Sequence, residues 1–243
     1  EPKPKEIFDN EIIEFLSDLS ILLLKNKDSK RYPDIIAFAY WIRKANLNLN
    51  KSNYENHTNR LGRGIAFNIA PSNVPINFAF SLAFSLLSGN ISIIRTPSKK
   101  YPQTIIICEA INKLLIKHKQ LVDYIYIIEY EKNNQITEKI SLISDIRIIW
   151  GSDKTISTIR KIETKPRTFD LIFSDRYSFC ILDSKAILLG SDKVTKDLTE
   201  LFFNDVFLFD QNACSSPHLI YWLGSDKNIN LAKNKFWKNL NIT

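Results

Sequence analysis

The hydrophobic pattern at the start of the chain is helical. Apolar positions recur at intervals of three and four across residues 7–25 and again across residues 33–45, as they do along one face of a helix. Residues 46–60 are rich in Asn, Lys and Ser, a composition typical of a loop. The pattern therefore predicts a helical N-terminal segment over residues 1–60.

From residue 61 onward, short apolar runs alternate with segments of helical periodicity. The predicted strands are residues 65–69, 91–95, 124–128, 146–150, 171–173, 177–182 and 218–223. The predicted helices are residues 75–88, 102–117, 135–143, 153–162, 195–203 and 227–240. This alternation is typical of parallel strands joined by crossover helices. We therefore expect an α/β fold with a doubly wound, mostly parallel sheet, which binds ligands beyond the carboxyl ends of its strands.

Composition and charge exclude several classes of protein. The 243 residues are 44% hydrophobic, which is typical of a folded globular chain rather than a disordered one. The net charge is +7, but the basic residues are scattered, whereas a nucleic-acid surface needs them clustered on one face. We therefore expect no nucleic-acid partner.

The uncharged stretch over residues 64–94 raises the question of a membrane span. Pro71, Pro75 and several Asn residues interrupt it, and its apolar run over residues 78–87 is too short to cross a bilayer. We expect a buried helix here and no membrane span.

The three cysteines differ in their neighbours. They form neither a zinc-binding spacing nor a disulfide framework, so we expect no metal site and a reducing, cytoplasmic location. Cys108 and Cys180 lie in apolar runs, whereas Cys214 lies among small polar residues in a predicted turn over residues 210–218. Cys214 is either a reactive nucleophile or an ordinary small thiol.

Other candidate residues each allow two interpretations. Asn73 is either the N-cap of the helix that follows it or a donor to an oxyanion. His218 lies close enough in sequence to activate Cys214, or it is a structural residue at the start of a strand. Gly151 and Ser152 open a helix whose amides can hold a phosphate. Arg95 and Lys99 are either solvated or in contact with a nucleotide.

Several motifs resemble one superfamily when they are taken together. Residues 71–75, Pro-Ser-Asn-Val-Pro, stand where aldehyde dehydrogenases carry Pro-Trp-Asn-Phe-Pro. Residues 87–99 resemble the Gly-Asn to Lys-Pro-Ser cofactor segment, residues 148–152 the Phe-Thr-Gly-Ser turn, and residues 211–214 the segment around the catalytic cysteine. With residues 32–45, these motifs resemble the long-chain acyl-CoA reductase (LuxC-type) branch of the aldehyde dehydrogenase superfamily.

The resemblance implies three parts and a set of roles. After the helical N-terminal segment over residues 1–60, residues 61–208 would be a Rossmann-like cofactor-binding domain, and residues 209–243 the beginning of a catalytic domain. Cys214 would attack an acyl thioester such as acyl-CoA, while Asn73 and the Cys214 amide stabilise the oxyanion, and hydride transfer would release an aldehyde. The residues implied to contact NADPH are Pro71, Ser72, Arg95, Ser98, Lys99, Gly151 and Ser152.

Two departures from the family pattern refine this expectation. Residues 173–178 match the region where aldehyde-oxidising relatives carry a Glu that activates water, and no Glu is present there, which favours reduction. Arg95 replaces the family's usual Lys, which keeps the charge but changes the geometry, so NADH stays open beside NADPH.

The chain is shorter than the family pattern, which continues well beyond the cysteine. An alternative is therefore a truncated, non-catalytic relative that binds a nucleotide or docks a partner. A separate alternative, which concerns the substrate, is reduction of an acyl phosphate. For a full-length chain the resemblance implies a homo-oligomer and an acyl-transferase or acyl-protein synthetase partner.

Overall fold

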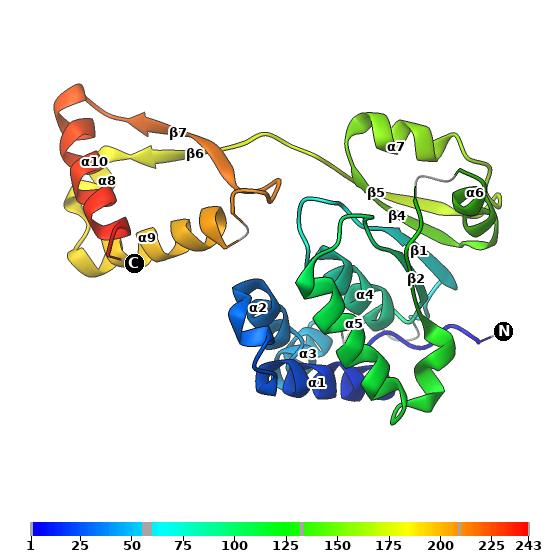
Figure 1. Ribbon diagram of the computed structural model, residues 1–243. Coiled ribbons are helices and arrows are strands. Elements are labelled where there is room, and N and C mark those ends of the chain that lie inside the picture. The colour runs from blue at the N-terminus through cyan, green and yellow to red at the C-terminus, as the bar shows by residue number, and fades with distance from the viewer. Residues whose placement is uncertain (1, 55–59, 132–133, 209, 243) are drawn as a thin grey trace. The chain divides into compact units, whose positions relative to one another are not determined.

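The computed structural model describes residues 2–54, 60–131, 134–208 and 210–242, in two compact units (Figure 1). The first unit is Glu1–Asp175 and the second is Arg176–Thr243.

The first unit is built on a five-stranded sheet in the order β3-β2-β1-β4-β5. Its strands are β1 (Ile65–Ile69), β2 (Ile91–Arg95), β3 (Ile125–Ile128), β4 (Ile146–Gly151) and β5 (Phe169–Ser174). Every pair in this sheet is parallel, because a helical segment separates each strand from the next. The predicted doubly wound α/β fold is confirmed.

Helices cover both faces of this sheet. They are α4 (Asn77–Leu87), α5 (Pro102–Leu115), α6 (Asn134–Ile143) and α7 (Asp153–Arg160), with η2 (Lys119–Tyr124) after α5. Phe67 and Ile149 share a core with Ile156 of α7 on one face. On the other face, Asn68 donates hydrogen bonds to Ser92 and to Ser85 of α4. Successive side chains of β1 therefore serve opposite layers.

The N-terminal helices pack against α4 and α5 (Figure 1). They are α1 (Asn10–Lys25), α2 (Pro33–Trp41) and α3 (Lys44–Ser52), with η1 (Ser29–Arg31) between α1 and α2. Asp9 caps α1 by accepting hydrogen bonds from the Glu11 and Ile12 amides, as an N-cap carboxylate does. Trp41 of α2 contacts Phe84 of α4, with their ring centroids 4.8 Å apart.

The prediction of a loop over residues 46–60 is wrong for its first half. Helix α3 runs through residues 44–52, and the helix predicted to reach Ala45 ends at Trp41. Leu47 of α3 is fully buried, so tertiary packing outweighs the weak helix propensity of the surrounding Asn residues. Residues 55–59 of the predicted loop lie outside the described part of the chain.

Helix α4 begins two residues later than expected and ends where Gly89 predicts. Pro75 and Ile76 form a turn before Asn77 opens the helix. Gly89 has a φ of +78°, and a Cβ there would lie 2.1 Å from the Lys5 carbonyl oxygen. Glycine is therefore required for the backbone to pass from α4 into β2.

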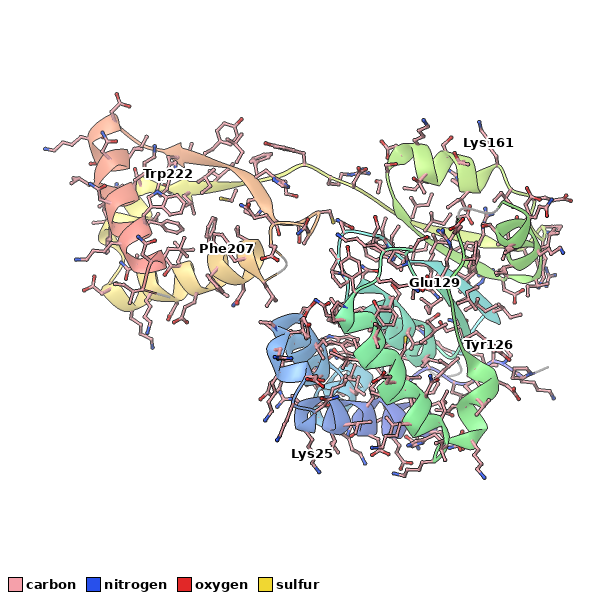
Figure 2. All side chains as sticks on the ribbon, in the orientation of Figure 1. Lys25, Tyr126, Glu129, Lys161, Phe207 and Trp222 are labelled. Atoms are coloured by element: carbon pink, nitrogen blue, oxygen red, sulfur yellow. The ribbon has the colours of Figure 1, made fainter. Side chains whose placement is uncertain are left out.

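The second unit consists of a small sheet and three helices. Strands β6 (Ser178–Asp183) and β7 (Pro217–Leu223) pair in parallel, and α8 (Ser184–Leu189), α9 (Asp192–Phe207) and α10 (Asp226–Leu240) accompany them. Leu182 and Trp222 turn from the strands toward a core formed by α8 and α10, where Figure 2 labels Trp222. Helix α8 was not expected from the sequence.

The chain divides into its two compact units between Asp175 and Arg176. The sequence predicts a boundary at residues 208–209 instead. Residues 176–208 belong to the second unit because β6 pairs with β7 and because α8 and α9 pack on α10. The assignment of residues 209–243 to a catalytic domain stays a prediction.

Within the described ranges, no helix combines the length and the apolar character needed to cross a bilayer.

Candidate active site

The carboxyl ends of the central strands bring most of the predicted cofactor residues to one edge of the first unit. Ile69, the last residue of β1, pairs with Arg95 on one side and with Ile149 on the other. The chain leaves β1 toward β2 and β3, and then returns to place β4 on the opposite side of β1. This reversal between β1 and β4 is the switch point at which doubly wound sheets bind their ligands.

The turn after β1 holds the first group of these residues. Pro71 is half-buried, while Ser72 and Asn73 are exposed. The Tyr101 hydroxyl donates a 2.6 Å hydrogen bond to the Ser72 carbonyl oxygen, which ties this turn to the start of α5. The N-cap position of α4 is Ile76, so the interpretation of Asn73 as the helix N-cap is wrong.

Arg95 closes β2 with its guanidinium beside an aromatic ring. The guanidinium carbon lies 4.8 Å from the centroid of Tyr130, and Nη2 donates to the Tyr130 carbonyl oxygen at 3.4 Å. The Nε atom of Arg95 is buried and has no hydrogen-bond partner among the described residues. Ser98 and Lys99 follow on the exposed surface.

Gly151 and Ser152 form the turn from β4 into α7. Gly151 has a φ of +155°, and a Cβ there would lie 3.1 Å from Thr155 Cγ2. Ser152 is the N-cap of α7 and accepts a 3.3 Å hydrogen bond from the Thr155 amide. The Ser152 hydroxyl therefore already has a structural partner, and the N-terminus of α7 that it caps is the kind of helix end that attracts an anion.

Two aromatic residues at this edge were not singled out by the sequence. Trp150 and Phe173 stack at a centroid distance of 4.0 Å and an angle of 9°. The Trp150 Nε1 atom is buried and lacks a hydrogen-bond partner among the described residues. Their positions at the ends of two predicted strands were the available signal.

The positive charge and the helix N-terminus at the ends of these strands suit a ligand that carries phosphate groups, such as a nucleotide. Arg95 Nε and Trp150 Nε1 are both buried donors, and a native protein pairs such groups with protein, water or a ligand. Arg95 and Lys99 add positive charge at and after the end of β2. Lys100 is less available to contribute, because its Nζ lies 2.6 Å from the carboxylate of Glu129.

The Cys214 turn lies in the second unit, between α9 and β7. Cys214 is exposed, whereas Cys108 and Cys180 are partly buried. Burial raises the pKa of Cys108 to about 11, with a smaller contribution from the Glu109 carboxylate. Burial also raises the pKa of Cys180. Of the three thiols, Cys214 is therefore the one that a bulky acyl donor can reach.

His218 and Asn73 are not brought to Cys214 by any described contact. His218 is exposed at the start of β7 and stacks on Tyr177, with ring centroids 5.2 Å apart. Asn73 belongs to the first unit and Cys214 to the second. The pairing of Asn73 with Cys214 in one site stays a prediction, as do the roles of the cofactor residues.

Comparison with known families decides the identity of the fold and of the family. The model of the family described as Acyl-CoA reductase (LuxC) matches residues 43–235. The chain belongs to the LuxC family.

This LuxC-family chain is also similar to curated proteins of Photorhabdus species. It is 24% identical over 177 residues to the long-chain acyl-protein thioester reductase of Photorhabdus luminescens. The match covers 70% of the chain but only 34% of that relative. The chain therefore spans about a third of the length of the curated relatives it matches.

The fold of the LuxC-family chain is that of the aldehyde dehydrogenase superfamily. It is similar to a glyceraldehyde-3-phosphate dehydrogenase from Methanocaldococcus jannaschii complexed with NADP, with a TM-score of 0.63, 16% identity and coverage of 93% of this chain and 53% of that one. Proline utilization A from Corynebacterium freiburgense gives a TM-score of 0.65 at 14% identity, covering 98% of this chain and 24% of that one. Similarity at this level of identity establishes the fold, and the activity has to be argued from the site.

Proposed function

We propose that this LuxC-family chain carries the acyl-transfer cysteine and the cofactor edge of a reductase that converts a fatty acyl thioester to an aldehyde. The observation that carries the proposal is the exposed Cys214, which lies in a polar turn that the family model covers, while the chain's other two cysteines are partly buried. An exposed thiol can be approached by a thioester, and its thiolate is the reacting form.

The acyl-transfer step follows from the chemistry of a thiol. Cys214 Sγ forms a bond to the acyl carbonyl carbon, the bond from that carbon to the donor sulfur breaks, and the proton from Cys214 leaves with the departing thiol. After the new bond has formed and before the old one breaks, the acyl oxygen carries negative charge. On this proposal the Cys214 amide and the Asn73 side chain would donate hydrogen bonds to that oxygen. The acyl group is then held on Cys214 as a thioester.

NADPH, when bound, would supply a hydride to the carbonyl carbon of the acyl group held on Cys214, and breakage of the bond from Cys214 Sγ to that carbon would release the aldehyde and leave Cys214 as a thiolate. Arg95, Ser98 and Lys99 would hold the cofactor from the end of β2, and Pro71, Ser72, Gly151 and Ser152 from the ends of β1 and β4. Because Arg95 stands in place of Lys, NADH is the alternative cofactor.

The substrate and the partner are proposed from chemistry and from the relatives. The Photorhabdus luminescens relative is named for an acyl-protein thioester, and acyl-CoA carries the same reacting group. The proposed partner is a protein that delivers the acyl group. It is either an acyl-transferase or an acyl-protein synthetase. The three free thiols suit a reducing cytoplasm, and a full-length chain is proposed to form a homo-oligomer.

A second candidate is a non-catalytic relative that binds a nucleotide or docks a partner. It is favoured by His218, which stacks on Tyr177 and has no described contact with Cys214 through which it would activate the thiol. On this alternative the cofactor edge of the first unit still binds a nucleotide, and no acyl group is transferred to Cys214.

Intact-protein mass after incubation with a long-chain acyl-CoA tests the proposal. We expect one acyl adduct on the wild-type chain, none on the Cys214→Ser variant, and an unchanged adduct on the matched Cys180→Ser variant. Addition of NADPH should remove the adduct and release an aldehyde, and a parallel sample with NADH compares the two cofactors. A folded wild-type chain that forms no adduct, but binds NADPH by fluorescence titration, would favour the second candidate.

A further inference from the structure

We infer that Ser178 is a positioning residue that orients Cys214 for acyl transfer. The Ser178 hydroxyl donates a 2.6 Å hydrogen bond to the carbonyl oxygen of Cys214. Both residues belong to the second unit. The inference rests on the proposed role of Cys214 and adds a residue to which no role in the reaction has been assigned.

The argument begins with the two peptide planes on either side of Cys214. A peptide unit is planar, so a hydrogen bond to its carbonyl oxygen also fixes the direction of its N–H. The Ala213 carbonyl oxygen accepts a 3.0 Å bond from the Ser216 amide, which fixes the plane that carries the Cys214 N–H. The Cys214 carbonyl oxygen is held by Ser178, which fixes the next plane.

Fixing both planes leaves χ1 as the remaining freedom of the Cys214 side chain. Because the N–H and the C=O of a trans peptide point in opposite directions, the Cys214 N–H points away from the Ser216 amide that binds the Ala213 carbonyl. The donor that the proposed reaction needs therefore lies on the side of this peptide plane opposite the internal bond.

The turn needs such bonds because its backbone is strained. Asp210 and Gln211 have φ values of +49° and +59°, a region that residues other than glycine seldom adopt and keep only when the surroundings impose it. The Gln211 amide bonds to the Val206 carbonyl oxygen at 2.8 Å, and the buried Ser216 hydroxyl bonds to the Asp205 carbonyl oxygen at 2.6 Å. These two bonds anchor the ends of the turn to α9, and Ser178 holds its centre to β6.

The strand pairing explains why a side chain, and not a backbone amide, donates the hydrogen bond to the Cys214 carbonyl oxygen. Ser178 pairs with Pro217, and Phe179 pairs with Leu219, so the register shifts by one residue at the start of the small sheet. Pro217 has no N–H to give to the ladder, and such irregularities re-aim the chain beside them. The Ser178 hydroxyl therefore connects β6 to the turn where the ladder of backbone bonds is interrupted.

The hydrogen bond from Ser178 should orient Cys214 more than it stabilises the fold of the second unit. The bond lies at the surface, where water competes for both groups, so its loss should leave the unit folded. Misplacement of a reacting group by about 1 Å can slow a reaction by about a hundredfold. We therefore expect loss of the Ser178 hydroxyl to slow acylation of Cys214 about tenfold.

The test measures two reactions of the same thiol in the full chain. Peptide mass mapping follows acylation by a long-chain acyl-CoA and alkylation by iodoacetamide at each cysteine, in the wild type, Ser178→Ala, Ser178→Thr and the exposed control Ser215→Ala. We expect Ser178→Ala to slow acylation of Cys214 about tenfold while its alkylation changes less than about twofold. Ser178→Thr should restore the rate because it keeps a hydroxyl, and Ser215→Ala should match the wild type.

Three results would overturn the inference. The first is acylation of Ser178→Ala at the wild-type rate. The second is an equal loss in Ser178→Ala and Ser178→Thr, which would make side-chain shape the cause. The third is rapid alkylation of Cys180, which lies in the same unit as Ser178, in Ser178→Ala; this would report unfolding of that unit and make Ser178 a folding residue.

Failure of the proposed function gives a different pattern. In that case wild-type Cys214 is alkylated normally but never acylated, so the proposed role of Ser178 in acyl transfer is rejected together with that function. If the wild type is acylated and Ser178→Ala is acylated equally fast, the function stands and only the role of Ser178 is rejected.

Discussion

At the scale of single residues, burial separates the three thiols of the chain. Cys108 lies in α5, Cys180 lies in β6, and both have a raised pKa because burial disfavours the thiolate. Cys214 is exposed in a turn. A cysteine that must react with a large thioester needs this access, and the other two are suited to packing.

The raised pKa of Cys108 predicts a loss of stability in alkaline solution. An unfolded Cys108 ionises near pH 9 and a folded one near pH 11, so the folded chain holds the proton more tightly. The stabilisation is complete below pH 9 and is lost as the pH rises through about 11. Two pKa units correspond to roughly 3 kcal/mol at most.

Urea unfolding between pH 8.5 and 11 checks this prediction. The wild type should lose more stability across this range than Cys108→Ala, because the variant has no thiol to ionise. Equal losses in the two proteins would show that Cys108 does not contribute. The quantity to compare is how steeply the free energy of unfolding falls with pH in each protein. This slope is not affected by the constant loss of stability that the smaller alanine side chain causes.

At the scale of elements, polar groups fix how the helices and strands meet. Arg147 of β4 is buried and forms a bidentate pair with Asp170 of β5, with distances of 2.7 and 2.8 Å. Asp18 of α1 accepts hydrogen bonds from Lys117 and His118 at the end of α5, and the His118 side chain is buried. These contacts join elements that are far apart in sequence and would be costly to leave half-made.

Asp18→Asn should weaken the attachment of α1 to α5. The hydrogen bond from Lys117 holds the pKa of Asp18 below its usual value, although partial burial opposes it. This stabilisation is present above the unfolded pKa of 3.8 and is lost as the pH falls through the lowered folded value. We expect a loss of about 1–2 kcal/mol at pH 7, which disappears in strong acid.

Thermal unfolding of Asp18→Asn beside Asp28→Asn measures this loss with a matched control. Asp28 also pairs with a base, Arg31, but both side chains are exposed, and such pairs contribute little. The prediction requires Asp18→Asn to melt clearly below Asp28→Asn at pH 7. It is contradicted if the two variants melt together.

At the scale of the whole molecule, two units carry the two halves of the proposed chemistry. The cofactor edge belongs to the first unit and the cysteine turn to the second, and the division falls between Asp175 and Arg176. Each unit has its own sheet and its own core. The small sheet of the second unit also presents exposed apolar side chains on one face, at Phe179, Ile181, Leu219, Tyr221 and Leu223.

The division predicts an early site of cleavage by trypsin. Arg176 is exposed in the segment between β5 and β6, and exposed segments between compact units are cut before the units themselves. Brief digestion should release fragments 1–176 and 177–243, identified by mass. Arg176→Gln should remove these fragments and leave the remaining cleavage pattern unchanged; early cuts inside β1–β5 would contradict the division.

The sequence by itself determined the class of fold and most of its elements. Strict alternation of apolar runs with helical segments leaves few arrangements besides a parallel doubly wound sheet. The ends of predicted strands also located the turns around Pro71, Arg95 and Gly151, because the carboxyl ends of parallel strands gather at one edge. The exposure of Cys214 followed from its polar neighbours.

Only the tertiary structure decided where packing or geometry overrides the local pattern. Leu47 buries itself and draws an Asn-rich stretch into helix α3, a choice that local propensity opposes. Helix α4 starts at Asn77, so its N-cap position is Ile76 and not Asn73, and the hydrogen bond from Ser178 to Cys214 joins residues 36 positions apart. Such contacts depend on the relative placement of distant segments, which periodicity along the chain does not contain.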